Sequence, residues 1–282
     1  MRMRNSHIGT AAGHLPFAAF FLVVGTVMFL PVYYLLVTTF KTPQEAVLSP
    51  LGLPSALTLD NYRRAFAAMR YFRSLANNAI ILVFSVLLLV ACSSMAAYVI
   101  ARSEAKRFRA LYSVFMVGLI IPYQVGLIPL YKIISALQLM NTHAGVVLIN
   151  AFCINLPLSI FLFRGFVHTI PLEIEEAASI DGCETFRCFW SVVLPMLRPI
   201  VATVAILDSL AVWNDFMTPL LFLQSPDKNV LLQQVYRNIG PFSVNWTSFF
   251  PMLVLATLPL AMLYLFLQRH IIESVVTGAI KG

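Results

Sequence analysis

The longest stretch of this sequence that combines charged residues with a regular spacing is EEAASIDGCETFRCFWSVVLP, residues 175–195. Carboxylates such as that of Glu176 can hold a basic partner through charge-assisted hydrogen bonds. Ala177 and Ala178 leave room for a second surface to come close, and Gly182 permits the backbone reversal at which a helix ends. These residue types fit either binding to another protein surface or an amphipathic helix that only covers the inner ends of the membrane helices, and the pattern alone leaves both open.

A second set of chemical groups lies in and beside an apolar stretch near residue 210. Asp208 and Asp215 are carboxylates in surroundings where a charge is expensive, so each needs a partner, a solute or a water-filled cavity. Trp213, Asn214 and Asp215 offer an aromatic ring, an amide and a carboxylate, a combination suited to binding sugars. Gln124, between two prolines, offers a further amide. The same side chains could instead form polar contacts between helices, and the sequence leaves both possibilities open.

The sequence offers no pattern for catalysis. It has no GxxxxGK[ST] loop for nucleotide phosphates, so the chain cannot hydrolyse ATP by that chemistry. Its histidines lack metal-ligand spacing, and its cysteines do not form the framework of a secreted disulfide-rich protein. We therefore expect no catalytic residue, metal or cofactor in this chain. The residues concerned are His7, His14, His143, His168, His270, Cys92, Cys153, Cys183 and Cys188.

The elements that must position these groups are membrane helices. Of 282 residues, 60% are hydrophobic and 11% are charged, whereas about 25% of residues are charged in a soluble domain. Because about 20 apolar residues cross a hydrocarbon core, six such runs predict an all-α membrane protein, a single domain over residues 1–282 with six transmembrane helices. The first run, from Phe17, is too long for a signal peptide and is expected to be retained. The expected spans are 17–40, 77–101, 110–131, 144–163, 200–223 and 248–267.

Two segments are expected to depart from straight spans. IIPYQVGLIP, residues 120–129, contains two prolines and a glycine, which predicts an irregular piece that faces the interior of the helix bundle. Residues 164–199 are expected to form two short helices joined at Gly182. Pro195 and Pro199 then mark the entry to the next span.

The net charge of +7 is best explained by loops at the inner membrane surface rather than by a nucleic-acid site. Basic residues gather in RSEAKRFR, residues 102–109, whereas the loop around Lys132 is nearly uncharged. Loops rich in Lys and Arg stay in the cytoplasm. We therefore expect residues 102–109, the segment 164–199 and both termini on the cytoplasmic side of a multi-pass membrane protein.

The stretch at residues 175–195 resembles the EAA loop of bacterial ABC importer permeases, with Val192 where isoleucine is usual. The stretches NLPLSIFLFRGF, VLPMLRPIVATVAIL and WNDFMTPLLFL are similar to carbohydrate-uptake permeases of the maltose-importer type. The likeness is greatest to the shorter of the two permease subunits of those importers. The residues that match the loop motif are Glu176, Ala177, Ala178, Gly182, Leu194 and Pro195.

The resemblance implies a type I ABC importer permease fold in a bacterial cytoplasmic membrane. It also implies a second permease subunit, two ATPase subunits that bind ATP and Mg, and an external solute-binding protein. In that family the EAA loop transmits motion from the ATPase to the membrane spans. The residues expected to couple to the ATPase are Glu175, Glu176, Ala177, Ala178, Asp181, Gly182, Leu194 and Pro195.

Two alternatives to an importer permease remain open at this point. An ion-coupled secondary transporter or channel would also have several apolar spans, although the sequence has no evident internal two-fold repeat. A membrane scaffold without a transport role would tolerate changes in residues 175–195. The sequence does not select the solute, so oligosaccharides, monosaccharides and glycerol-phosphate-like compounds all remain. The substrate-path candidates are Gln124, Trp213, Asn214 and Asp215.

Overall fold

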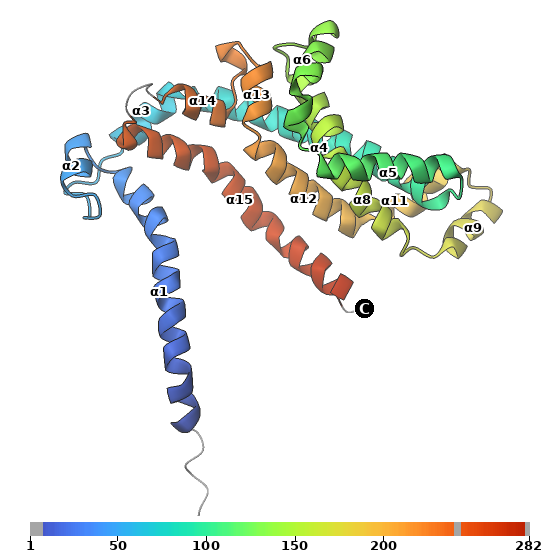
Figure 1. Ribbon diagram of the computed structural model, residues 1–282, viewed down its shortest axis with the longest axis horizontal. Helices are drawn as coiled ribbons and strands as arrows, with labels where there is room; N and C mark the ends of the chain where they lie inside the picture. Colours follow the sequence, from blue (N-terminus) through green and yellow to red (C-terminus); the bar gives the residue numbers. More distant parts are fainter. Residues whose placement is uncertain (1–7, 240–243, 280–282) are drawn as a thin grey trace, which may run out of the picture. The chain divides into compact units, whose positions relative to one another are not determined.

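The computed structural model describes residues 8–239 and 244–279, with side chains over 17–239 and 244–265. In these ranges every regular element is a helix (Figure 1). Both termini are expected in the cytoplasm and carry the basic residues Arg2, Arg4, Arg269 and Lys281. The side chains of these four residues lie outside the described part of the chain. The elements are α1 Ile8–Thr38, α2 Pro43–Leu48, α3 Asp60–Ala68, α4 Tyr71–Arg102, α5 Lys106–Ile120, η1 Tyr123–Gly126, α6 Leu127–Ala136, α7 His143–Leu148, η2 Ile149–Ile154, α8 Leu156–Val167, α9 Leu172–Ile180, α10 Thr185–Cys188, η3 Phe189–Val193, α11 Leu194–Met196, α12 Arg198–Asn214, α13 Met217–Phe222, η4 Pro226–Lys228, α14 Leu231–Arg237 and α15 Trp246–Ala279.

The chain divides into two compact units. The first contains residues 1–69 and 237–255, and the second contains residues 70–236 and 256–282. Three helices of the described residues are long and apolar enough to cross a membrane: α1 from Phe17, α4, and α15 as far as Leu265. Three bent helix pairs satisfy the same test, so the described residues provide up to six spans.

The bent pairs lie where proline interrupts an apolar run. The run expected at 110–131 is not one helix, because α5 ends at Ile120 and the chain turns by 100° through Pro122 into η1 and α6. This confirms the irregular piece predicted at 120–129, but the expectation that it faces the bundle interior is not met, because most of its residues are exposed, Val125 and Ile128 at 74% and 73%. The run that contains Pro157 bends by 52° where α8 begins, and the run that contains Pro199 bends by 79° where α12 begins. Proline has no backbone N–H to donate, so a helix can be broken there at a small loss of hydrogen bonding.

Helix α4 begins at Tyr71, before the apolar run expected to start at residue 77. Its first turns are polar, and these side chains hold the segment near Asp227. The Arg73 guanidinium donates to the Asp227 carbonyl, and the Asn77 amide donates to the carbonyls of Asp227 and Asn229. The Asn78 side-chain oxygen accepts from the backbone N–H of Leu231. The helix can therefore begin before the apolar run, because the polar side chains of its first turns have hydrogen-bond partners.

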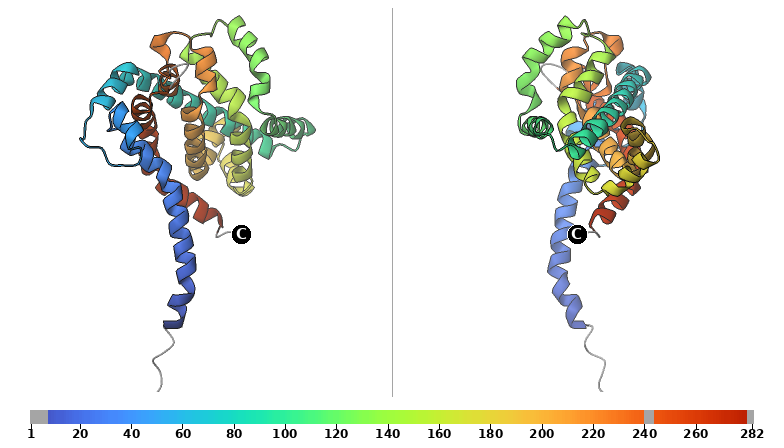
Figure 2. Two further views of the ribbon diagram at one scale, coloured as in Figure 1. Left: turned by 60° about the vertical axis from the view of Figure 1, so that its left-hand side comes forward. Right: turned by 90° about the vertical axis from the view of Figure 1, so that its right-hand side faces the viewer.

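The core of the second unit lies among α4, α8 and α12, which Figures 1 and 2 show side by side. Apolar side chains from these helices and from η3 fill it without exposure to solvent. Between membrane spans this core is stabilised by close van der Waals packing, because lipid tails are as apolar as the side chains and supply no hydrophobic driving force between helices. The fully buried members include Ala97, Ile160, Phe163, Val167, Val193, Leu197 and Val204.

In the first unit, the chain after α1 folds around the buried ammonium group of Lys41. Its Nζ donates to the carbonyls of Ser49 and Pro50, at 2.7 and 3.0 Å. The Asn61 amide, also buried, donates to the carbonyls of Thr39 and Lys41, both at 2.8 Å. These four hydrogen bonds fix the loop between α1 and α3.

Replacing Lys41 with Met is expected to destabilise this loop, because the two carbonyls lose a charged donor worth about 2 kcal/mol in net stability. Limited proteolysis of the membrane-embedded protein should then cleave faster between α2 and α3. Lys132→Met, at an exposed position, serves as the control and should leave the cleavage rate unchanged. Equal cleavage of the two variants would contradict a structural role for Lys41.

Candidate functional site

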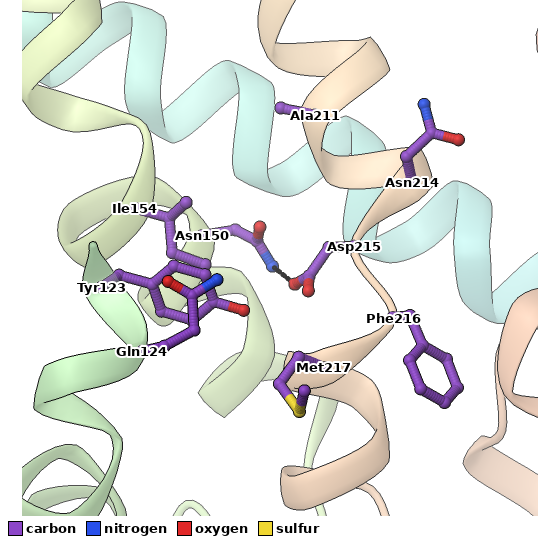
Figure 3. Close-up of a pocket in the computed structure, with 9 residues that line it drawn as sticks. All are labelled: Tyr123, Gln124, Asn150, Ile154, Ala211, Asn214, Asp215, Phe216 and Met217. Carbon is purple, nitrogen blue, oxygen red and sulfur yellow. Dashed lines mark hydrogen bonds between the residues drawn. The ribbon is translucent and has the colours of Figure 1, made fainter. Parts of the chain in front are cut away.

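A cavity of about 330 Å³ lies among η1, η2 and the junction of α12 with α13 (Figure 3). One wall comes from η1, which follows the sharp bend after α5, and another comes from the π-helical turn η2. The third comes from the end of α12 and the start of α13. Irregular backbone inside a membrane protein is tolerated where it is covered by protein or lines a cavity. The lining residues are Tyr123, Gln124, Asn150, Ile154, Ala211, Asn214, Asp215, Phe216 and Met217.

The polar centre of the cavity is a pair formed by Asn150 and Asp215. Figure 3 shows the two side chains pointing toward each other, and the Asn150 amide donates to Asp215 Oδ2 at 3.4 Å. Asp215 Oδ1 accepts from the backbone N–H of Thr218 at 3.1 Å, in the first turn of α13. The Asn150 side-chain oxygen has no hydrogen-bond partner among the described residues. Asp215 therefore holds the helix break together and also presents a carboxylate to the cavity.

The residues predicted for a substrate path separate into two groups. Gln124, Asn214 and Asp215 line the same cavity, although Figure 3 shows the Asn214 amide pointing away from the Asn150–Asp215 pair. Trp213 does not line it. Its ring is buried, and its indole N–H donates to the carbonyl of Ala256 at 3.2 Å.

Asp208 also lies away from the cavity. It is 2% exposed and accepts a hydrogen bond from Ser159 Oγ at 3.0 Å, which joins α12 to α8.

Sequence reasoning missed Asn150 as a cavity residue. The available signal was an amide within an apolar run, which needs a partner just as a carboxylate does.

The segment from α9 to α11 folds as two helical pieces around Gly182. Gly182 has a φ of +80°, a value that side chains other than glycine rarely adopt. The backbone N–H groups of Asp181, Gly182 and Cys183 donate to carbonyls in the last turn of α9, which closes that helix. The two helices predicted on either side of this glycine are thus present, and a glycine at a positive φ terminates the first of them.

The second piece of this segment is apolar on two sides. Phe189 and Val193 are buried in the core, and Phe189 stacks against Tyr98 with ring centroids 5.3 Å apart. Phe186 and Trp190, 69% and 42% exposed, face outward with Ile180 at 86%. Phe186, Phe189, Trp190 and Val193 recur at helical spacing in the sequence, but the structure divides these four residues between the core and the surface.

The residues expected to couple to an ATPase are likewise divided. Glu175 is buried, Ala178 and Leu194 are half-buried, and the remaining members are exposed. The Glu175 carboxylate forms an ion pair with Arg102 at 2.6 Å. Nearby, partial burial and the positive charges of Arg164 and Arg102 lower the pKa of His168. The exposed members are Glu176, Ala177, Asp181, Gly182 and Pro195.

A family model described as "Binding-protein-dependent transport system inner membrane component" matches residues 90–276. This range contains both the cavity and the segment from α9 to α11. The chain belongs to this family. It is a multi-pass permease of an ABC importer, a transport subunit that works with ATPase and solute-binding components, and not an enzyme.

The curated relatives of this permease have similar length. It is 33% identical over 260 residues to a probable starch degradation products transport system permease protein, AmyC, of Thermoanaerobacterium thermosulfurigenes, covering 92% of this chain and 94% of that one. It is 34% identical over 261 residues to the melibiose/raffinose/stachyose import permease protein MelC of Bacillus subtilis, with the same two coverages.

A solved structure confirms the predicted fold class, an all-α membrane protein with the type I importer permease fold. The match is to a chain of a bacterial ABC transporter involved in the import of the acidic polysaccharide alginate. The TM-score is 0.81, over 95% of this permease and 99% of that chain, at 19% sequence identity. At this identity the likeness concerns the fold alone.

Two glycine substitutions should change the stability of the permease in opposite directions. An added Cβ meets no atom within 4 Å at either Gly182 or Gly165, but only Gly182 has a positive φ. Gly182→Ala is expected to lower the melting temperature in detergent, because the left-handed backbone conformation costs a non-glycine residue about 1–2 kcal/mol. Gly165→Ala, within α8, should raise it, because alanine stabilises a helix interior by about 1 kcal/mol relative to glycine. A higher melting temperature for Gly182→Ala would contradict the strained conformation at this turn.

Proposed function

We propose that this permease is one of two different membrane subunits of an ATP-driven importer of sugars, and that its cavity is part of the solute path. The observation that carries this proposal is the set of relatives with similarity over more than nine-tenths of the chain. They are named for starch degradation products, for melibiose, raffinose and stachyose, and for arabinooligosaccharides. The solute class we assign is therefore oligosaccharides. Membership of the binding-protein-dependent transport family argues against the two alternatives, an ion-coupled transporter and a scaffold without a transport role.

The cavity is suited to a polyhydroxylated solute. Its polar groups are the Asp215 carboxylate and the amides of Gln124, Asn150 and Asn214, and its Tyr123 supplies an aromatic ring. Sugar hydroxyls both donate and accept hydrogen bonds, so amides and a carboxylate can pair with them while a ring packs on the apolar face of a pyranose. A pathway shared with a second permease would explain why one chain provides only part of such a site.

We assign the contact with the ATPase to a docking face made of Glu176, Ala177, Ile180, Phe186 and Trp190. All five residues are exposed, and they come from both helical pieces around Gly182. Exposed aromatic and aliphatic side chains beside a single carboxylate are typical of a protein-binding surface, in which an apolar centre supplies most of the affinity. ATP and Mg then bind to the ATPase subunits and not to this chain.

The contact between Arg102 and Glu175 supports a cytoplasmic position for both termini. Because Arg102 contacts Glu175 directly, the basic loop after α4 and the docking face belong to the same side of the membrane. That loop carries the basic residues that favour the cytoplasm. With an even number of spans, both ends of the chain lie on that side, in the bacterial inner membrane.

The assembly can be tested by gentle purification of the tagged permease from its native membrane, followed by mass spectrometry of its companions. We expect a second permease and a P-loop ATPase in stoichiometric amounts. The purified complex, reconstituted in proteoliposomes with its binding protein, should accumulate labelled oligosaccharides when ATP is supplied. Recovery of a single permease type, or transport of amino acids but not sugars, would overturn the proposal.

Glu176→Lys is expected to weaken binding of the ATPase by about tenfold or more, because it reverses a charge on the docking face. The measurement is titration of the purified ATPase onto the permease pair in nanodiscs. Glu104→Lys, an exposed carboxylate in the loop after α4, is the matched control and should bind normally. Native affinity in Glu176→Lys would remove this residue from the contact.

Gln124→Ala and Asn214→Ala are expected to raise the solute concentration at half-maximal transport, each by about fivefold to tenfold, since each removes a polar group from the cavity. Transport should be measured with the isolated complex, so that the amount of assembled protein is known. Ser113→Ala, on the exposed side of α5, should leave the concentration dependence unchanged. An unaltered dependence in both cavity variants would place the solute path elsewhere.

A further inference from the structure

Helix α9 is attached to its unit in an unusual way. Of its nine residues only Glu175 is buried, and a carboxylate is therefore its innermost side chain. A surface helix is normally held by an apolar stripe that faces the core. In α9, however, Leu172, Ile174 and Ile180 are exposed, at 48%, 37% and 86%. The attachment of α9 thus depends more on the polar contacts of Glu175 than on the apolar side chains of this helix.

Those contacts use both oxygens of the carboxylate. Glu175 Oε1 accepts from Arg102 Nη2 at 2.6 Å and from Arg102 Nε at 2.8 Å, and Oε2 accepts from the Tyr98 hydroxyl at 2.8 Å. Arg102 Nη2 also donates to the carbonyl of Ile170 at 2.9 Å. The side chains of Arg102 and Glu175 are 19% and 9% exposed, so water screens the pair only weakly.

The geometry fixes α9 at two points. Tyr98 and Arg102 are four residues apart, so they lie on one face of the last turns of α4. Ile170 comes just before Pro171, which precedes the first residue of α9, and Glu175 lies one turn into that helix. One face of α4 therefore holds both the entry to α9 and its first turn. A planar guanidinium with several fixed donors maintains direction as well as distance.

We propose that Tyr98, Arg102 and Glu175 form a clamp that makes the cytoplasmic end of α4 move together with α9. The clamp rests on the proposed function in one respect, namely that the ATPase displaces the docking face. Glu176 and Glu175 then have separate tasks. Glu176 faces outward to the ATPase, while Glu175 faces inward and passes the displacement to α4, which packs against α8 and α12 along the bundle.

An ion pair that served stability alone would have a different signature. Its loss would reduce the amount of assembled importer, but each assembled importer would still move its normal number of solute molecules for each ATP hydrolysed. Loss of the clamp would reduce that ratio, because the ATPase would move α9 without moving α4. The ratio of transport to ATP hydrolysis is therefore the informative measurement.

The test uses the complete importer in proteoliposomes, normalised to assembled complex. Glu175→Gln is expected to lower the ratio of solute transported to ATP hydrolysed by about tenfold, a coupling change of ordinary size. Tyr98→Phe, which removes one of the hydrogen bonds, should lower it less. Glu104→Gln, exposed in the loop after α4, is the control and should have the native ratio. A native ratio in Glu175→Gln would overturn the clamp.

A second measurement leaves the three clamp residues unchanged. Genetically encoded spin labels at the exposed positions Val99 on α4 and Ser179 on α9 report the distance between the two helices in the native complex. The clamp predicts the same distance distribution without nucleotide and in the ATP-trapped state. A shift of that distribution between the two states would show α9 moving independently of α4 and would overturn the proposal.

The failure of the clamp can be told from the failure of the proposed function. If Glu176→Lys loses ATPase binding while Glu175→Gln has the native ratio, the docking face is correct and the clamp is wrong. If Glu176→Lys binds the ATPase normally, the docking face is wrong, and a constant spin-label distance still supports the rigid link between the helices.

Discussion

Buried polar side chains in this permease need partners, and the positions of its helices depend on that requirement. An unpaired amide or carboxylate in apolar surroundings costs several kcal/mol, so each such group fixes its neighbours. Asn77 and Asn78 hold the start of α4 to residues 227–231. Asp208 joins α12 to α8 through Ser159. Apolar packing fills the spaces, and these polar contacts decide which turn of one helix lies beside which turn of another.

The cavity and the docking face use the same requirement for different purposes. In the cavity, Asn150 is buried and donates to Asp215 Oδ2, while the half-buried carboxylate of Asp215 lines the space. Behind the docking face, the buried carboxylate of Glu175 has partners for both oxygens. The carboxylate of Asp215 is thus left beside a cavity, whereas the carboxylate of Glu175 is used to hold α9 to α4.

The sequence predicted the class of fold and much of its layout, because length and hydrophobicity decide which segments can span a membrane. Proline and glycine also placed the break at 120–129 and the turn at Gly182. The sequence could not decide which side of α9 faces inward. Glu175 and Glu176 are alike in type and adjacent in the chain, and only the partner on α4, 73 residues away, distinguishes them. Trp213 was grouped with Asn214 and Asp215 by sequence, but consecutive helical residues point in different directions.

The three helix breaks also bear on how the permease can change shape. Bending an intact helix such as α4 would rupture backbone hydrogen bonds where no water can replace them. At Pro122, Pro157 and Pro199 the proline nitrogen has no hydrogen to donate, so the angle there can change with a smaller loss of hydrogen bonding. The unbroken helices are therefore stiff, and the three breaks at proline bend more easily. A change of shape that keeps the unbroken helices straight therefore has to be accommodated at these three breaks.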